Sequence, residues 1–394
     1  MRRLATGIGA ALLLVPVAPG EERPAATPVA KDQVMVGAYY YPWWRGEDDR
    51  GRKNWLEKVP RLRLDPPQHP AAGLYSSDNP ALISEHIAQS RRGGIDFWAV
   101  SWWGPDSQSD RVFRQRILKH GKASELRYAV LYESEGRFGG LKNPKFANWK
   151  TDLAYLREHI FPDPNYLKIG GRPVLIVYLT RALFRGDGEQ CFKVLREEFP
   201  EVYLIGDEVF GPGYKPERAA LFDAVTAYDV YGQSAKPKGS NRKAVEALAR
   251  NYRDAREAAK SAGKGFVPVV APGYNDTRVR PGNEPAPRYF AEEPGSQQGD
   301  VFRAMIADAA LPNLDPATGN MMLVTSFNEW YEDTQIEATT GKAGATSKDN
   351  SDSGREVTRG MTYQDYGCFY LDTLREMTGQ WRPPAGGSKG TKAD

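Results

Sequence analysis

Two glutamates three residues apart, Glu329 and Glu332, are the residues of this sequence best placed to do chemistry together. They follow an apolar run at residues 321–324 that is typical of a buried strand, and Trp330 stands between them. Enzymes that cut glycosidic bonds need one carboxyl group as acid and one as base, close to the sugar. The alternative is a solvated acidic turn that caps a helix. The preceding strand and the aromatic neighbours favour the acid–base interpretation.

The spacing of the pair places a condition on the backbone. Residues three apart on a strand point to opposite faces, so the chain must turn after Glu329 if both carboxyl groups act at one site. One helical turn would bring the Cβ atoms of Glu329 and Glu332 to roughly 5–6 Å from each other. That separation suits the roughly 5–5.5 Å between the carboxyl groups of retaining glycosidases better than the wider gap of inverting ones.

Other side chains of the same chemical kinds follow the other predicted strands. Tyrosines, tryptophans, carboxylates and amides dominate these positions, including both Trp102 and Trp103 after the second strand. Aromatic rings offer flat faces to sugar C–H groups, and carboxylates and amides hydrogen-bond hydroxyl groups, so the surface favours a carbohydrate ligand. The residues that we expect to contact substrate are Tyr40, Trp43, Trp102, Glu133, Tyr228, Tyr274, Asp276, Arg280, Asn328 and Trp330.

Some of these candidates have a structural alternative. Glu133 could pair with Arg137, four residues further on, instead of contacting a sugar. Asp276 and Arg280 could hold their own loop together rather than touch a ligand. At least one of the tyrosines at 39–41 is expected to line the protein core. His86, in a helical pattern, is interpreted as a hydrogen-bonded helix residue rather than a ligand.

The elements that position these residues alternate between strand and helix along the chain. Continuously apolar strands indicate burial on both faces, as in a parallel sheet. Eight such units in about 350 residues predict an α/β fold with a single (β/α)8 TIM barrel. A doubly wound open sheet is the alternative, but no glycine-rich phosphate loop follows the first strand. The predicted strands are 34–41, 95–102, 126–132, 173–178, 202–206, 224–230, 266–271 and 321–326.

Helix ends and loop lengths support this arrangement. Asn79 and Pro80 predict the start of a helix that runs to Arg92, and Asn241 opens a long helix that Gly263 closes. Strand-to-helix connections in a barrel emerge at the carboxyl ends of the strands, where active sites of this fold lie. The long connections of this kind are 43–79, 273–299 and 338–361.

Composition and the chain ends limit the function classes. The 394 residues carry a net charge of +3 with no basic stripe, so nucleic acid is not an expected partner. Residues 1–26 have the basic start and short apolar core of a signal peptide, too short to span a membrane. We therefore expect an exported protein, periplasmic or extracellular, with no membrane-spanning segment in the mature chain. A linker at 27–33, a catalytic domain at 34–382 and a disordered tail at 383–394 complete the predicted organisation.

The cysteines and histidines argue against a disulfide, a metal site or a Ser-His-Asp triad. Cys191 and Cys368 fall in helical patterns predicted to lie on opposite sides of the barrel, so both are expected to be free, buried thiols. None of the four histidines follows a predicted strand. The sequence predicts neither a metal ion nor an organic cofactor, and it leaves the oligomeric state open.

Several motifs occur in one order along most of the chain. They are Tyr39-Tyr40-Tyr41 with Trp43, residues 73–78 with His86, residues 100–102, Tyr132-Glu133, Phe222-Asp223, residues 272–277 with Arg280-Pro281, residues 325–330 with Glu332, and residues 334–337. With these motifs the chain resembles glycoside hydrolase family 99, the endo-α-mannosidase and endo-α-mannanase family, over residues 34–381.

The resemblance implies a retaining reaction that passes through a 1,2-anhydro sugar. Glu329 would act as base on the 2-hydroxyl of the sugar. Glu332 would protonate the leaving oxygen and then deprotonate water. An acid of this kind should have a raised pKa while its partner stays ionised. The resemblance also places Glu133 and Tyr228 around the cleaved sugar.

The chain departs from the family pattern beside the catalytic pair. Tyr331 stands where endomannosidases of the family have His, and Asp333 stands where they have Gly. The segment 132–135 replaces Ile-Glu-Pro-Tyr, and a His-rich segment is missing around Trp55. The catalytic pair is kept while its surroundings change, so the reaction class is the firmer expectation, and the sugar and linkage stay open.

The sequence thus predicts a secreted, endo-acting hydrolase of α-mannosidic linkages in a polysaccharide or glycan. One alternative is a family-99-like protein that acts in polysaccharide assembly or glycosyl transfer. The other is an inactive barrel that binds carbohydrate. The presence of both glutamates disfavours an inactive barrel, and the lack of an apparent nucleotide-diphosphate loop disfavours transfer from an activated donor.

Overall fold

A computed structural model describes residues 33–46, 49–211, 213–231 and 241–379. The predicted signal peptide at 1–26, the linker up to residue 32 and the tail at 383–394 lie outside these residues. Within the described part of the chain, no helix is long and apolar enough to cross a membrane.

The strands of the barrel form a ring in which neighbours are parallel, and the short β4 (Lys168–Ile169) pairs antiparallel with β5 outside this ring. β8 and β9 are two pieces of one segment that is interrupted at Val267 and Pro268. β8 pairs with β7 and β9 pairs with β10, so this segment closes the ring. The prediction of a single (β/α)8 barrel is confirmed. In ring order the strands are β1 (Met35–Tyr40), β2 (Phe97–Trp102), β3 (Arg127–Tyr132), β5 (Arg172–Val177), β6 (Tyr203–Asp207), β7 (Ala224–Thr226), β8 (Gly265–Phe266), β9 (Val269–Val270) and β10 (Met321–Val324).

Aromatic side chains fill much of the barrel. Tyr40 stacks on Trp98 with ring centroids 4.0 Å apart and planes 8° apart. The absence of a side chain at Gly37 makes room for the Phe97 ring, because a Cβ atom at this glycine would lie 2.1 Å from Cζ of that ring. Burial of such large apolar surfaces is the main force that holds a barrel of this kind together.

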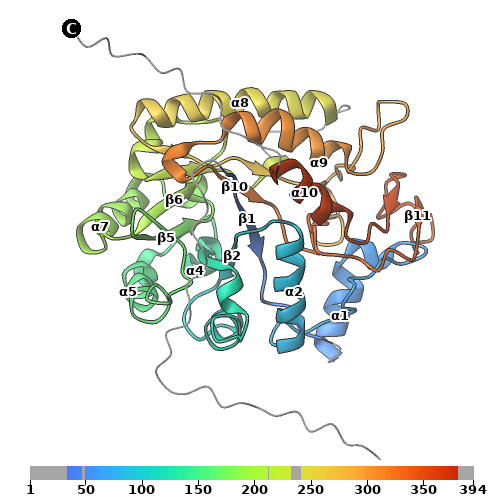
Figure 1. Ribbon diagram of the computed structural model, residues 1–394, viewed down its shortest axis with the longest axis horizontal. Helices are drawn as coiled ribbons and strands as arrows, with labels where there is room; N and C mark the ends of the chain where they lie inside the picture. The colour runs from blue at the N-terminus through green and yellow to red at the C-terminus, as the bar shows by residue number, and fades with distance from the viewer. Residues whose placement is uncertain (1–32, 47–48, 212, 232–240, 380–394) are drawn as a thin grey trace, which may run out of the picture.

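The helices lie around the strands, with α8 along one edge of the molecule (Figure 1). The Asn79 side chain caps α2 by accepting a hydrogen bond from the Ala81 N–H at 2.9 Å, as predicted. Gly263 follows α8 in the left-handed region, at φ +68°, which confirms the predicted end of that helix. The α-helices are α1 (Asp49–Lys58), α2 (Pro80–Arg92), α3 (Gln108–Val112), α4 (Ser134–Phe138), α5 (Trp149–His159), α6 (Thr180–Leu183), α7 (Gln190–Glu198), α8 (Asn241–Ser261), α9 (Asp300–Ala304) and α10 (Phe369–Gly379).

Both cysteines are free thiols, as predicted. Cys191 is buried in α7, and burial raises its pKa to about 12. Cys368, just before α10, is only half-buried, which corrects the expectation that both are buried.

The long connections after β1 and β10 pack on each other. The segment after β1 carries α1, and the segment after β10 carries the short antiparallel pair β11 (Ala345–Thr346) and β12 (Tyr363–Gln364). Backbone bridges join Leu64 to Asp349 and Pro70 to Thr339. Figure 1 shows β11 beside α1 for this reason. The loops thus form a layer that supports the carboxyl end of β10.

Candidate active site

The turn that carries both glutamates is fixed by Ser326, just beyond β10. The Ser326 hydroxyl accepts a hydrogen bond from the Glu329 N–H at 2.8 Å and lies 2.9 Å from the Thr334 hydroxyl. Between these two anchors residues 330–333 form a turn. Oε1 of Glu329 accepts from the Tyr331 N–H at 2.9 Å. The chain therefore turns after Glu329, as the spacing requires for a joint site.

Glu332 is held by an arginine and a tyrosine from two other loops. Arg280 donates to Oε1 of Glu332 at 3.1 Å, and the Tyr228 hydroxyl donates to Oε2 at 3.4 Å. The same Arg280 nitrogen lies 2.8 Å from Asp276. Arg280 and Asp276 thus hold their loop together, and Arg280 also contacts the catalytic candidate. Its side chain is 56% exposed and that of Glu332 18%, so this end of the site faces solvent.

The electrostatic environments of the two glutamates differ. Burial, and then the neighbouring Glu332, raise the pKa of Glu329 well above its usual value. Burial also raises the pKa of Glu332, but Arg280 opposes that rise. Arg280 favours the ionised form of Glu332 more directly than that of Glu329, because it contacts Glu332. The raised pKa of Glu329 differs from the expectation of an ionised partner beside a protonated acid.

A third carboxyl group, that of Glu133, lies at the end of β3. It accepts a hydrogen bond from the Ser101 hydroxyl at 2.6 Å. Burial, reinforced by the charge of Glu332, raises the pKa of Glu133 to about 8, so it is largely neutral at pH 7. The alternative pairing with Arg137 is wrong, because that guanidinium is held by Asp152 at 2.7 Å.

Aromatic side chains from four loops line one side of the pair. The Tyr41 hydroxyl donates to that of Tyr228 at 2.7 Å. The ring of Trp43 lies 4.5 Å from Tyr41, 6.0 Å from Trp103 and 6.3 Å from Tyr331, measured between centroids. Beyond this wall is a cavity of about 190 Å³, lined by Trp43, Trp44, Arg45, Gly51, Asn54, Trp55, Gln108 and Tyr331. Its lining offers indole, amide and guanidinium groups to a ligand.

Tyr41 and Trp103 are the aromatic residues that selection from the sequence missed. Trp103 is 40% exposed, and its indole N–H donates to the Ser101 hydroxyl that also binds Glu133. Trp102, the predicted contact, is fully buried and donates to Asp110 at 2.9 Å. Neighbouring residues at a strand end point to opposite sides, so only one of two adjacent tryptophans can face the site.

Tyr40 and Trp330 do not reach a substrate either, because both are fully buried. The Tyr40 hydroxyl lies 3.1 Å from Nδ1 of His86, whose Nε2 lies 3.1 Å from Glu337. The Trp330 indole donates to the same Glu337 carboxylate at 2.8 Å. The two predicted substrate contacts, Tyr40 and Trp330, therefore support the catalytic turn instead. The interpretation of His86 as a hydrogen-bonded helix residue is confirmed.

Of the remaining predicted contacts, some line the site and others only hold its residues in position. Asn328 is fully buried, and its side chain exchanges two hydrogen bonds with the backbone of Tyr41, at 2.7 and 3.1 Å. It therefore positions the aromatic wall rather than a sugar. Tyr39 also lines the core, as expected of at least one of the tyrosines at 39–41. Tyr274 is half-buried near Glu332 and Asp276, whose charges, after burial, raise its pKa.

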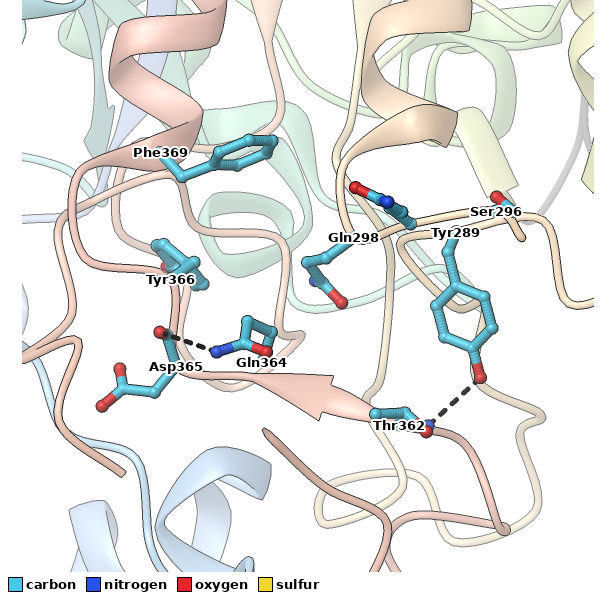
Figure 2. A pocket seen from close by; sticks show the side chains of 9 residues that line it. Tyr289, Ser296, Gln298, Thr362, Gln364, Asp365, Tyr366 and Phe369 are labelled. Atoms are coloured by element: carbon cyan, nitrogen blue, oxygen red, sulfur yellow. Dashed lines mark hydrogen bonds between the residues drawn. The ribbon is translucent and has the colours of Figure 1, made fainter. Parts of the chain in front are cut away.

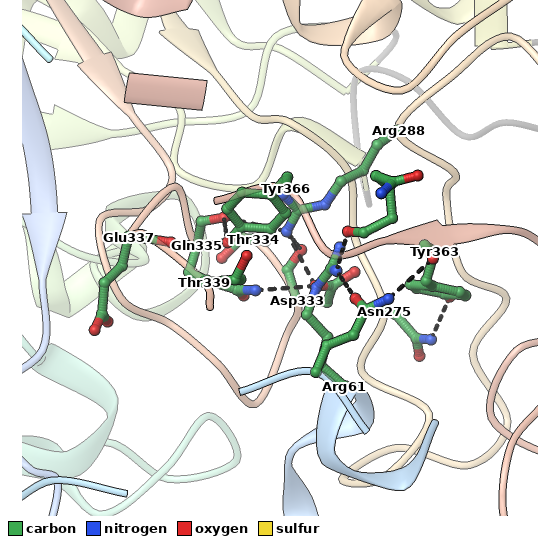
Figure 3. Close-up of polar contacts among 12 residues, drawn as sticks. Arg61, Asn275, Arg288, Asp333, Thr334, Gln335, Glu337, Thr339, Tyr363 and Tyr366 are labelled. Carbon is green, nitrogen blue, oxygen red and sulfur yellow. Dashed lines mark hydrogen bonds and ion pairs between the residues drawn. The ribbon is translucent and has the colours of Figure 1, made fainter. Parts of the chain in front are cut away.

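A buried charge cluster begins one residue after Glu332 (Figure 3). Asp333 accepts hydrogen bonds from Arg61 and from Arg288, the latter at 3.0 Å. All three side chains are at most 2% exposed. Asp333 has φ +50°, a left-handed conformation that glycine adopts without strain and that aspartate tolerates better than most residues. Two guanidinium groups thus share one carboxylate beneath the catalytic turn.

Fold and site together define a (β/α)8-barrel protein with a coupled pair of carboxyl groups at the carboxyl end of the strands. Among the described residues, no group of three or more His, Cys, Asp or Glu side chains lies close enough to hold a metal ion. Active sites of barrels of this class lie at this end.

Comparisons with known proteins show similarity to one family of glycoside hydrolases. The model for glycosyl hydrolase family 99 matches residues 239–369. Glycoprotein endo-alpha-1,2-mannosidase of Mus musculus is 23% identical over 382 residues, covering 88% of this chain and 74% of that protein. An endo-alpha-1,2-mannosidase-like protein of Homo sapiens is 24% identical over 350 residues, covering 76% and 67%. The structure of the GH99 endo-alpha-mannosidase from Bacteroides thetaiotaomicron matches with a TM-score of 0.61 at 20% identity, covering 89% and 98%. The chain is thus similar to glycoside hydrolase family 99 in its carboxyl-terminal part by the family model, and to endo-alpha-1,2-mannosidases over most of its length.

Proposed function

We propose that this protein is an exported, retaining, endo-acting hydrolase of α-mannosidic linkages in a polysaccharide or glycan. The observation that carries the proposal is the pair Glu329 and Glu332, which lie on one turn, are electrostatically coupled and border an aromatic wall. The names of the mouse and Bacteroides relatives support the α-mannoside as substrate. The signal-peptide pattern at 1–26 supports export.

In the proposed reaction the sugar's own 2-oxygen is the nucleophile. Glu329 takes the proton of the 2-hydroxyl, and the 2-oxygen forms a bond to C1. The bond from C1 to the leaving oxygen breaks, and that oxygen receives the proton of Glu332. Water then attacks C1 and the bond from C1 to the 2-oxygen breaks. Glu332 takes a proton from the water, and Glu329 returns its proton to the 2-oxygen. Two inversions at C1 retain the configuration, and both carboxyl groups end as they began.

The reaction needs one proton on the pair, and it needs that proton on Glu332. Before a sugar binds, the Arg280 contact opposes protonation of Glu332. A bound sugar reverses the preference, because its 2-hydroxyl donates to an ionised Glu329 while the glycosidic oxygen accepts from a protonated Glu332. Substrate binding would therefore move the shared proton to the residue that acts as acid.

Hydrolysis of a defined α-mannan, with the anomer of the product followed by NMR, tests the proposal. We expect the first product to have the α configuration. In Glu332→Gln, kcat should fall by roughly 10²–10⁴-fold, the range typical of general acid–base catalysis. Glu329→Gln should be equally impaired and should not be rescued by azide, since no glycosyl-enzyme forms. Glu57→Gln, an exposed change in α1, is the control.

Other outcomes would contradict specific parts of the proposal. A β product would exclude retention, and unchanged turnover in Glu332→Gln would exclude its role as acid. Binding of α-mannan without any cleavage would favour the inactive carbohydrate-binding barrel instead. Transfer of mannose to an acceptor in place of hydrolysis would favour a role in polysaccharide assembly. Export is tested separately by the amino-terminal sequence of the protein recovered outside the cytoplasm, which should begin near residue 27.

A further inference from the structure

A second, larger pocket lies away from the catalytic pair, between the loop that follows β9 and the segment that leads into α10 (Figure 2). Its volume of about 580 Å³ is within the range of small-molecule sites, roughly 300–1,000 Å³. Its lining residues are Tyr289, Ser296, Gln297, Gln298, Thr362, Gln364, Asp365, Tyr366 and Phe369.

Neutral hydrogen-bonding groups dominate the lining. Gln298 donates to the Tyr370 hydroxyl at 2.8 Å, and Figure 2 shows its amide between the rings of Tyr289 and Tyr366. Among the described residues, no hydrogen bond engages the side-chain oxygen of Gln298 or of Gln364. These amide oxygens are available to the hydroxyl groups of a ligand.

Asp365 is held through one of its carboxylate oxygens by groups outside the pocket. Its Oδ2 accepts hydrogen bonds from the Thr340 hydroxyl and from the N–H groups of Lys342 and Ala343, all within 2.9 Å. None of the lining residues carries a positive charge. An anionic ligand would meet no cation, and an aliphatic one would leave the glutamine amides unpaired. The lining therefore suits a neutral ligand that is rich in hydroxyl groups.

Aromatic rings on opposite sides of the pocket are held in place before any ligand binds. Gly299, at φ +97°, lets the Phe369 ring approach the backbone, because a Cβ atom there would lie 2.3 Å from Cε1 of that ring. Across the pocket, the Tyr289 hydroxyl accepts from the Thr362 N–H at 3.2 Å. Ordered aromatic faces of this kind lower the entropic cost of binding a flat ligand surface.

The pocket is separate from the catalytic cleft. It shares no lining residue with the cavity beside Tyr331. The ring of Tyr366 lies 5.1 Å from the Arg288 guanidinium, which belongs to the buried cluster around Asp333. This buried layer stands between the pocket and the turn that carries the catalytic pair.

We propose that this pocket is a second carbohydrate-binding site, which takes a neutral hexose unit between Phe369 and Tyr289. Both loops that form it start at the carboxyl ends of strands, on the same face of the barrel as the catalytic pair. A polysaccharide held here would be kept close to the cleft, which raises its local concentration. This role in substrate capture rests on the proposed function, but the binding of sugar does not.

Photo-labelling locates bound sugar directly. The probes are an α-mannoside and an α-glucoside that carry a diazirine, applied to the Glu332→Gln protein so that hydrolysis cannot remove the label. Trypsin should release the pocket residues in two peptides, 289–303 and 360–375, and the catalytic pair in a third, 304–342. We expect label on one or both of the first two peptides, and competition by free methyl α-mannoside or methyl α-glucoside.

Substitutions in the same protein test whether that label depends on the pocket. Phe369→Ala and, independently, Gln298→Leu should reduce labelling of these peptides at least fivefold, whereas Phe146→Ala, a half-buried phenylalanine outside the pocket, should not. Two substitutions are used so that a folding defect in one, detected by circular dichroism, does not decide the result.

The second site and the proposed function fail in different ways. Label confined to peptide 304–342, or label on the pocket peptides that neither pocket substitution reduces, would overturn the second site. Label on peptides 289–303 or 360–375, together with no hydrolysis of α-mannan by the natural protein, would uphold the second site and overturn the proposed function.

Discussion

Glu332 and Asp333 are neighbours in the chain, yet they belong to clusters of opposite electrostatic character. Around Glu332, three carboxyl groups have raised pKa values, and the Arg280 guanidinium contacts only one of these three, Glu332 itself. Around Asp333, two buried guanidinium groups share one carboxylate. The first cluster has more carboxyl groups than positive charges, which favours the protonated form of these groups, as acid–base chemistry requires. The second is short of negative charge and fixes the turn on which the first depends.

Removing the single negative charge of the second cluster should have the largest effect. Asp333→Asn keeps the size of the side chain but leaves Arg61 and Arg288 buried without an anion, for which the typical cost is about 3–5 kcal/mol. We expect the free energy of unfolding in urea to fall by that amount. Asp352→Asn, an exposed change, is the control, and a loss no larger than the control's would refute the structural role of the cluster.

Neutralising a carboxyl group of the first cluster should raise the free energy of unfolding instead of lowering it. Burial raises the pKa of Glu133 to about 8, above its usual 4.5. The folded protein therefore binds this proton more tightly than the unfolded chain does, and its stability contribution is complete below pH 4.5 and is lost as the pH rises through 8.

Glu133→Gln keeps a neutral side chain at every pH, so it should escape that loss. Near pH 5 the variant and the natural protein should have similar unfolding free energies. At pH 9 the variant should be more stable by about 2 kcal/mol, since each pKa unit is worth about 1.4 kcal/mol and relaxation of the site absorbs part of the effect. Urea unfolding at both pH values measures this difference. Glu57→Gln, an exposed change in α1, should show no pH-dependent gain, and an equal gain there would exclude the explanation by burial.

The two clusters also differ in how far the sequence predicts them. The strands and the turn with Glu329 and Glu332 are local features, because apolar runs and short spacings define them. The Asp333 cluster joins residues up to 272 positions apart, so no local pattern marks it. Asp333 stands where endomannosidases of the family have Gly. The positive φ at this position suits both residues, and of the two only aspartate can pair with arginine.

Errors in the strand and contact predictions have equally specific causes. The strand predicted at 224–230 ends at Thr226, because Asp207 accepts a hydrogen bond from the Tyr228 N–H at 2.8 Å and draws the chain out of the ladder. Aromatic type alone does not show which side of a strand end a residue faces. The sequence therefore does not show that Trp103, rather than the predicted Trp102, faces the site.

The smallest expected effect concerns Arg280, the guanidinium that contacts Glu332. It favours every ionised form of the catalytic pair, so it lowers the pH at which the pair takes up its first and its second proton. Removing it in Arg280→Gln should move both limbs of the pH profile of kcat/KM upward, by about one pH unit because the arginine is partly exposed. Arg278→Gln is a matched control, since that arginine pairs with Glu356 instead. If Arg280→Gln lowered kcat/KM without moving either limb, Arg280 would bind substrate rather than tune the pair. A downward movement would place the working proton under the control of another group, and Glu133, with its pKa of about 8, would be the first candidate.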